Sequence, residues 1–164
     1  MDNRIIYCGE GIDDIREIAK TKRIAMCHGV FDLLHRGHMT LFDFAKQYAD
    51  YVIVSLVADK FVNKGPGRPI IKETERAYML ANLRSVDKVI LTTEYYPFNI
   101  IELYRPDIWV HGGRTQPAPE HKLLEQLGKV RFGDTNAGIF DRYHPLVTPS
   151  HQLDKNISAS RRIL

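Results

Sequence analysis

The sequence predicts an α/β protein: a single domain built on a Rossmann-like, doubly wound parallel sheet. Three observations favour this fold. Short apolar runs alternate along the chain with amphipathic stretches of helical length. The run at 51–57 is almost continuously apolar and rich in β-branched residues, as in a strand that is covered on both faces. Repeated strand–helix units of this length imply parallel strands joined by crossover helices.

The individual elements follow from the local pattern. The first predicted helix is 12–21, because Ile12, Ile15 and Ile18 recur on one side of it. The remaining predicted helices are 38–49, 73–83, 96–104, 120–127 and 157–163. The predicted strands are 24–28, 51–57, 86–91, 108–111 and 129–132. Glycine and proline residues mark a loop at 60–70, between the second strand and the helix that follows it.

Length and composition indicate one domain over residues 1–164. A chain of 164 residues that is 44% hydrophobic and 26% charged can bury a core without disulfide bonds. We expect the core to span about 22–132 and the last helix to occupy 157–164. The long stretch 133–156 contains no clear helix or strand pattern, so a mobile loop is predicted there.

The net charge and the cysteine spacing limit the classes of protein to which this chain can belong. A formal net charge of +3 suits phosphate-bearing substrates, while no basic stripe with interleaved aromatic residues indicates nucleic-acid binding. The two cysteines lack the spacing of a disulfide framework, and no apolar run reaches the length of a membrane span. The N-terminus also lacks the apolar stretch of a signal peptide. We therefore expect a soluble, cytoplasmic protein.

The most informative segment is the turn between the strand at 24–28 and the helix at 38–49. Its sequence runs from Gly29 to His38 and reads Gly-Val-Phe-Asp-Leu-Leu-His-Arg-Gly-His. At such a turn, free backbone N–H groups and the positive end of the helix dipole favour a bound anion. His35 and His38 are three residues apart, so both can face the same phosphate, and Gly37 leaves room for close approach.

The pattern Gly-x-Phe-Asp-x-x-His-x-Gly-His resembles the HxGH signature of the cytidylyltransferase-like nucleotidyltransferase superfamily. The resemblance implies an enzyme in which His35 and His38 are catalytic. The backbone amides of Gly29, Val30 and Phe31 would bind the nucleotide. Asp32 is expected to fix the turn rather than bind a metal ion, and His28, the last residue of the strand, is expected to be structural.

Three further segments resemble the superfamily in the same order along the chain. The loop at 58–66 contains Lys64, which corresponds to a catalytic lysine that contacts the phosphates. Arg76, near the start of the helix at 73–83, corresponds to a phosphate-binding arginine, with Arg68 as a weaker candidate. The segments Arg-Pro-Asp-Ile-Trp-Val-His-Gly-Gly at 105–113 and Ile-Ser-Ala-Ser at 157–160 supply the other predicted nucleotide-binding residues. These are His111, Gly112, Ile157 and Ser158.

The chain departs from the superfamily at two positions. Arg114 stands where relatives have an acidic residue beside the nucleotide, and Leu153 stands where many have an arginine. These departures leave open a nucleotide-binding module that has lost catalysis. Trp109 lies within a predicted strand, so we expect it in the core rather than stacked on a base.

Within the superfamily, the chain looks most similar to the nucleotidyltransferase domain of ADP-heptose synthase and to glycerol-3-phosphate cytidylyltransferase. The resemblance implies transfer of a nucleoside monophosphate from CTP to a sugar or polyol phosphate, with release of pyrophosphate, to make a building block for polysaccharide biosynthesis. ATP acting on a sugar phosphate such as heptose phosphate is the alternative. Mg²⁺ would accompany the triphosphate, held largely by phosphate oxygens and water rather than by a protein cage. Relatives of this kind are commonly homodimers.

Overall fold

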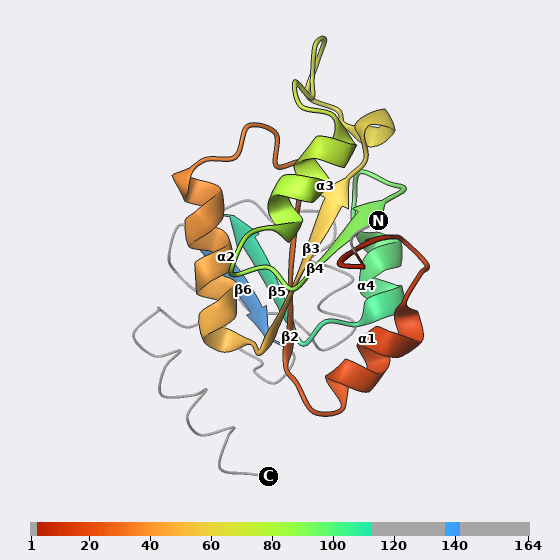
Figure 1. The fold of residues 1–164 in the computed structure, drawn as a ribbon, viewed down its shortest axis with the longest axis vertical. Helices are drawn as coiled ribbons and strands as arrows, with labels where there is room; N and C mark the ends of the chain where they lie inside the picture. Colours follow the sequence, from red (N-terminus) through yellow and green to blue (C-terminus); the bar gives the residue numbers. More distant parts are fainter. Residues whose placement is uncertain (1–2, 113–136, 142–164) are drawn as a thin grey trace.

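The computed structural model describes residues 3–112 and 137–141, which form a six-stranded sheet between two layers of helices (Figure 1). The strands are β1 Ile5–Tyr7, β2 Ile24–Gly29, β3 Tyr51–Val57, β4 Lys88–Thr92, β5 Ile108–Gly112 and β6 Ala137–Asp141. The helices are α1 Ile12–Ala19, α2 Arg36–Tyr48, α3 Glu73–Ala81 and α4 Phe98–Tyr104, with a short 3₁₀ helix, η1, at Asp59–Phe61. The predicted doubly wound α/β fold is confirmed.

The strand order is β1-β4-β3-β2-β5-β6, and the first five strands are parallel. β6 is antiparallel to β5, with Ile108 opposite Asp141 and Gly112 opposite Ala137. The prediction of a loop throughout 133–156 is therefore wrong at 137–141. The physical reason is pairing at an edge: without β6, the outer side of β5 would leave its N–H and C=O groups unpaired. The predicted elements at 120–127, 129–132 and 157–163 lie outside the described residues.

Helices cover both faces of the sheet, because side chains alternate along each strand. In β2, Ala25 and Cys27 join one buried cluster, which α2 and α3 complete. Ile24 and Met26 join a second cluster on the opposite face, which α1 and α4 complete. This placement of helix pairs on opposite faces of a parallel sheet leaves the carboxyl ends of the strands at one shared edge.

β1 is the one described strand, apart from β6, that the sequence pattern does not predict. It contains three residues, and its position is set by parallel pairing with β4, where Ile5 lies opposite Val89. A three-residue run is too short to show a period. Of the helices described, none is both long and apolar enough to span a membrane.

Candidate active site

The strand order places a topological switch point between β2 and β5. From β2 the chain passes through α2, on one face, to β3; it reaches β5 on the other side of β2 through α4, on the opposite face. In open α/β sheets, ligands bind beyond the carboxyl ends of the two strands that flank such a point. Gly29 ends β2 and His111–Gly112 end β5, so both predicted binding segments border the switch point.

His35 caps the N-terminus of α2 with its own side chain. Its backbone is extended, and its Nδ1 accepts a hydrogen bond from the backbone N–H of Gly37 at 3.1 Å. A neutral imidazole has one donor and one acceptor nitrogen. Because Nδ1 accepts, Nε2 carries the proton and can donate to a ligand. A Cβ at Gly37 would lie 3.0 Å from the His35 ring, a tight contact that would push the ring aside and that glycine avoids.

His38 stacks on His35 with ring centroids 3.8 Å apart and planes inclined by 23°. The edge of its ring also meets Phe31, at a centroid distance of 5.2 Å. Burial lowers the pKa of His38 from 6.5 to about 4, and electrostatic interactions with His35 and with the Lys64 ammonium add to the shift. Its Nδ1 is buried and has no hydrogen-bond partner among the residues that the structure describes. The free protein thus holds a neutral imidazole with an unused polar atom at the helix N-terminus.

The lowered pKa of His38 gives a stability prediction. Between about pH 6.5 and pH 4 the unfolded chain binds a proton at His38 that the folded chain does not bind. The contribution of His38 to the free energy of unfolding is therefore fully present above pH 6.5 and is lost as the pH falls toward 4. Urea denaturation at pH 7.5 and pH 5 should show a smaller pH effect in His38→Gln than in the parent. If the free energy of unfolding changed equally with pH in the two proteins, the lowered pKa of His38 would be contradicted.

Asp32 connects the turn after β2 to the loop before α3. One of its carboxylate oxygens accepts hydrogen bonds from Arg68 and from the backbone N–H of Ile70, both at 2.9 Å. The other accepts from the backbone N–H of Ile71 at 3.0 Å. Burial opposes ionisation of Asp32, but these hydrogen bonds and the Arg68 charge lower its pKa to about 2. Asp32 thus has a structural role, as predicted, and Arg68 is its partner.

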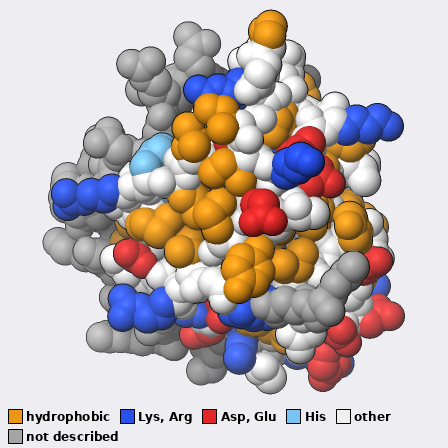
Figure 2. Space-filling view, turned by 45° about the horizontal axis from the view of Figure 1, so that its top comes forward, with side chains coloured by type: hydrophobic (Ala, Val, Ile, Leu, Met, Phe, Trp, Pro, Cys, Tyr) orange, Lys and Arg blue, Asp and Glu red, His pale blue; other side chains and the backbone are white. Residues whose placement is uncertain are grey.

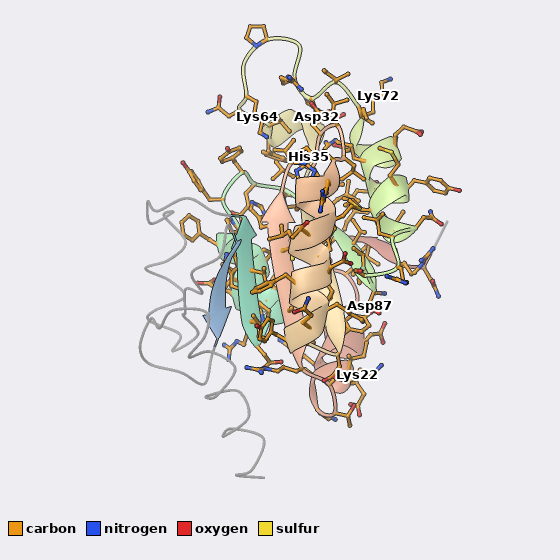
Figure 3. The ribbon with its side chains drawn as sticks, turned by 90° about the vertical axis from the view of Figure 1, so that its left-hand side faces the viewer. Lys22, Asp32, His35, Lys64, Lys72 and Asp87 are labelled. Atoms are coloured by element: carbon orange, nitrogen blue, oxygen red, sulfur yellow. The ribbon has the colours of Figure 1, made fainter. Side chains whose placement is uncertain are left out.

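Lys64 lies exposed on the loop that joins η1 to α3. Gly65 and Gly67 have φ values of 90° and 76° on this loop, a conformation that favours glycine. Lys64 is close enough to lower the pKa of His38. Figure 3 shows Lys64, Asp32 and His35 at the same end of the molecule, at the N-terminus of α2. The predicted catalytic residues His35, His38 and Lys64 are therefore brought together.

The turn itself is conformationally constrained. Phe31 and Leu33 have positive φ values of 49° and 55°, which are uncommon for residues other than glycine. The side chains of Val30 and Phe31 are buried, so only their backbone groups could meet a ligand. A Cβ at Gly29 would lie 3.1 Å from the Phe31 ring. Glycine at position 29 thus allows Phe31 to fold back under the turn.

Arg76 is placed differently from the prediction that it binds phosphate. Its side chain is fully buried, and its Nε donates to the carbonyl oxygen of Ile71 at 2.8 Å. The rest of the guanidinium donates to the carbonyl oxygens of Val30 and Val57 and to the carboxylate of Asp59. These acceptors occupy the guanidinium in this structure, so phosphate binding by Arg76 stays a prediction. The arginine faces the sheet, where the carboxyl ends of β2 and β3 present these acceptors, and it holds the turn in place.

Most of the chain matches one family. Residues 26–162 match the profile of the Cytidylyltransferase-like family. The chain belongs to this family of nucleotidyltransferases. It is 43% identical over 117 residues to the bifunctional protein HldE of Aliarcobacter butzleri strain RM4018, in an alignment that covers 69% of the chain and 25% of that protein. It is 46% identical over 96 residues to the bifunctional protein HldE of Caulobacter sp. strain K31, with 57% and 20% covered.

The chain thus spans about a quarter or less of the length of these curated relatives. Among solved structures, the lipopolysaccharide core biosynthesis protein from Thermoplasma volcanium GSS1 is similar in fold, with a TM-score of 0.56 and 28% identity. That alignment covers 64% of this chain and 85% of the solved one.

Part of the family's binding pattern falls beyond the described residues. His111 and Gly112 are described as the last residues of β5. Ile157 and Ser158, with the departures Arg114 and Leu153, lie outside the described residues, so the roles given to them stay predictions. Trp109 is 1% exposed and belongs to the core, as predicted.

Two residues that support the site were not singled out from the sequence. Asp59, the partner of Arg76, also donates its backbone N–H to Glu73 at 2.6 Å. Ser55 is fully buried and lies 2.8 Å from Nδ1 of His28. A single polar residue within the apolar run 51–57 was the available signal for Ser55, whereas nothing in the sequence distinguishes Asp59 from a solvated aspartate.

Proposed function

We propose that this chain transfers a nucleoside monophosphate from a nucleoside triphosphate, with ATP as the favoured donor, to a small sugar phosphate and releases pyrophosphate. The observation that carries the proposal is the stacked pair His35 and His38 at the N-terminus of α2, with Lys64 beside it, at the switch point of a cytidylyltransferase-like fold. Backbone N–H groups, a helix dipole and three nitrogen-bearing side chains there suit an array of phosphates.

The chemistry needs no activated protein nucleophile. A phosphate oxygen of the acceptor attacks the α-phosphorus of the triphosphate, and the bond from the α-phosphorus to the pyrophosphate oxygen breaks. Negative charge grows on the leaving oxygens, so positioned donors lower the barrier. Nε2–H of His35 and the ammonium of Lys64 are such donors. His38 stacks on the His35 ring and lies beside these donors.

Mg²⁺ would be held mainly by the triphosphate and water. The described residues include no group of three or more His, Cys, Asp or Glu side chains that could hold a metal ion. The carboxylate of Asp32, which is nearest in sequence to the histidines, is already occupied by hydrogen bonds from Arg68, Ile70 and Ile71. The ion would offset the negative charge of the triphosphate, since Mg²⁺ commonly binds through substrate phosphates.

The choice of donor rests on the relatives. The sequence resembles both ADP-heptose synthase and a cytidylyltransferase, and it favours CTP. The relatives named bifunctional protein HldE, and the neighbour named as a lipopolysaccharide core biosynthesis protein, support the first of these two. A product that contains ADP requires ATP as the donor. The alternative of ATP and a heptose phosphate is therefore better supported than CTP, which the comparisons do not confirm.

Competition binding tests the donor. In the presence of Mg²⁺, ATP should displace a fluorescent ATP analogue at lower concentration than CTP does. Pyrophosphate release should then be measured with each of the four nucleoside triphosphates against a panel of sugar, polyol and amino-alcohol phosphates. Preference for CTP would show that CTP is the donor, and the proposal of a nucleotidyltransferase would still hold. Binding without turnover across the panel would favour a nucleotide-binding module that has lost catalysis.

Lys64 should affect both substrates. Lys64→Ala removes an ammonium expected to lie between the reacting phosphates, so the KM values for ATP and for the acceptor should both rise. Lys64→Arg should restore little, because a planar guanidinium does not replace a compact ammonium at a crowded phosphate junction. Lys22→Ala is the matched control, since Figure 3 shows Lys22 at the opposite end of the molecule. Unchanged kinetics in Lys64→Ala would make Lys64 an ordinary surface lysine.

A further inference from the structure

His28 lies at the point where β2 ends, one residue before the glycine turn, and both of its ring nitrogens are engaged. Nδ1 lies 2.8 Å from Oγ of Ser55, the residue opposite it on β3. Nε2 lies 2.8 Å from the carbonyl oxygen of Tyr95, 67 residues away in the sequence. The ring also stacks on Trp109 of β5, with centroids 6.0 Å apart and planes inclined by 26°. His28 thus contacts both neighbouring strands and one distant loop.

These contacts fix the state of a neutral His28. A carbonyl oxygen can only accept, so Nε2 must donate to Tyr95. Nδ1 is then the acceptor and receives the hydroxyl proton of Ser55. Each nitrogen therefore has its own partner, and the bond from Nε2 is the one that reaches the loop.

The loop at 93–97 joins β4 to α4 and carries two exposed aromatic side chains. Tyr95 and Tyr96 are 36% and 45% exposed, and their rings meet at 5.1 Å. The loop's other side-chain hydrogen bonds are local. Thr92 donates to the carbonyl oxygen of Glu94, and the Glu94 carboxylate accepts from the backbone N–H of Asn99. Local bonds shape this loop, but they do not attach it to β2.

The loop lies on the opposite side of the β2 end from the histidine pair. His28 shares the face of Met26 and Trp109, which α1 and α4 cover, whereas Phe31 packs into the cluster covered by α2. Figure 2 turns this end of the molecule toward the viewer and shows hydrophobic side chains grouped in its middle, with charged side chains among and around them. Leu33, Ile70, Tyr95 and Tyr96 are the large exposed hydrophobic residues on the loops at this end.

We propose that His28 is a positioning residue that holds the tyrosine-bearing loop 93–97 against the end of β2 and so fixes one side of the candidate active site. The catalytic part of this inference rests on the proposed function, whereas the attachment of the loop does not. His28 acts through the Tyr95 carbonyl and needs no contact with substrate.

Three substitutions at one position separate the two hydrogen bonds. The amide nitrogen of glutamine reaches about as far as Nε2 of histidine, so His28→Gln can still donate to Tyr95. The amide of asparagine reaches only as far as Nδ1, so His28→Asn keeps the Ser55 side and loses Tyr95. His28→Phe keeps the ring on Trp109 and loses both bonds. Thermal unfolding of each variant serves as the control for global stability.

Hydrogen exchange of the peptide 92–99, measured by mass spectrometry on the whole chain, is the first readout. We expect exchange about tenfold faster in His28→Asn and His28→Phe than in the parent, as the loss of one hydrogen bond implies. His28→Gln should stay close to the parent. If Gln and Asn exchange alike, or if all variants match the parent, the proposal is wrong. Should His28→Phe fail to fold, the comparison of Gln with Asn still decides.

The second readout is pyrophosphate release from ATP with a heptose phosphate. The kcat/KM for this acceptor should fall about tenfold in His28→Asn and recover in His28→Gln, because displaced groups near a reacting centre cost rate. The positioning role would be wrong if His28→Asn lost activity while the hydrogen exchange of peptide 92–99 stayed unchanged. It would also be wrong if His28→Gln did not recover the kcat/KM of the parent. If the parent protein shows no turnover, the proposed function fails, and hydrogen exchange alone decides the attachment of the loop.

Discussion

Alanine in place of His35 or His38 should lower turnover by about 10²–10³, the usual effect of removing one preorganised donor from a charge-stabilising site. His35 offers Nε2–H because its Nδ1 is occupied by Gly37. His38 stacks directly on that ring, so each substitution also disturbs its partner. Turnover is measured as pyrophosphate release at saturating substrate, with circular dichroism confirming the fold.

A matched variant separates catalysis from helix capping. His35→Ala also removes the N-cap of α2, which costs about 1 kcal/mol of stability. Asparagine is a good N-cap and can accept from Gly37, but its short amide does not reach the position of Nε2. His35→Asn should therefore keep the stability of the parent and lose the turnover. If both His35→Asn and His38→Ala kept near-normal turnover, the proposed mechanism would be wrong.

Arg76 should matter most for folding. Arg76→Met leaves the carbonyl oxygens of Val30, Val57 and Ile71 without their donor and leaves Asp59 without its ion pair. Each buried carbonyl oxygen left without a donor costs about 1–3 kcal/mol, so the sum is a large share of the stability of an ordinary domain. Urea denaturation should show this loss, and the chain is expected to be partly unfolded at 37 °C.

Arg76→Lys tests geometry at constant charge. A lysine has one nitrogen and cannot serve four acceptors that surround a planar fork, so most of the loss in stability should remain. Arg84→Lys, on the segment after α3, serves as an arginine-to-lysine control. An Arg76→Met protein as stable as the parent, with weaker ATP binding only, would contradict the structural role and support the phosphate-binding role predicted from the sequence.

Much of the fold could be predicted from local pattern. The apolar runs at β2, β3 and β5 and the amphipathic helices between them carry their own periodicity, which the parallel order then follows. β1 and β6 could not be predicted, because each is a short strand that pairs with a distant one. The three residues of β1 are too few to show a period, and the sequence Ala-Gly-Ile-Phe-Asp of β6 contains no continuous apolar run. Pairing with the partner strand is what orders both of them.

The placement of the two histidines beside each other was determined by the sequence alone. His35, Gly37 and His38 lie within four positions, and the helix that follows the turn brings them together whatever surrounds them. The hydrogen-bond partners of Arg76, Arg68 and His28 were decided only by tertiary structure. Arg76 and Arg68 are the same residue type, and the sequence does not distinguish their surroundings. In the structure Arg76 faces the sheet and is fully buried, while Arg68 pairs with Asp32 near the surface. Burial and the partners of a long polar side chain depend on elements far away in the chain, and no local pattern contains them.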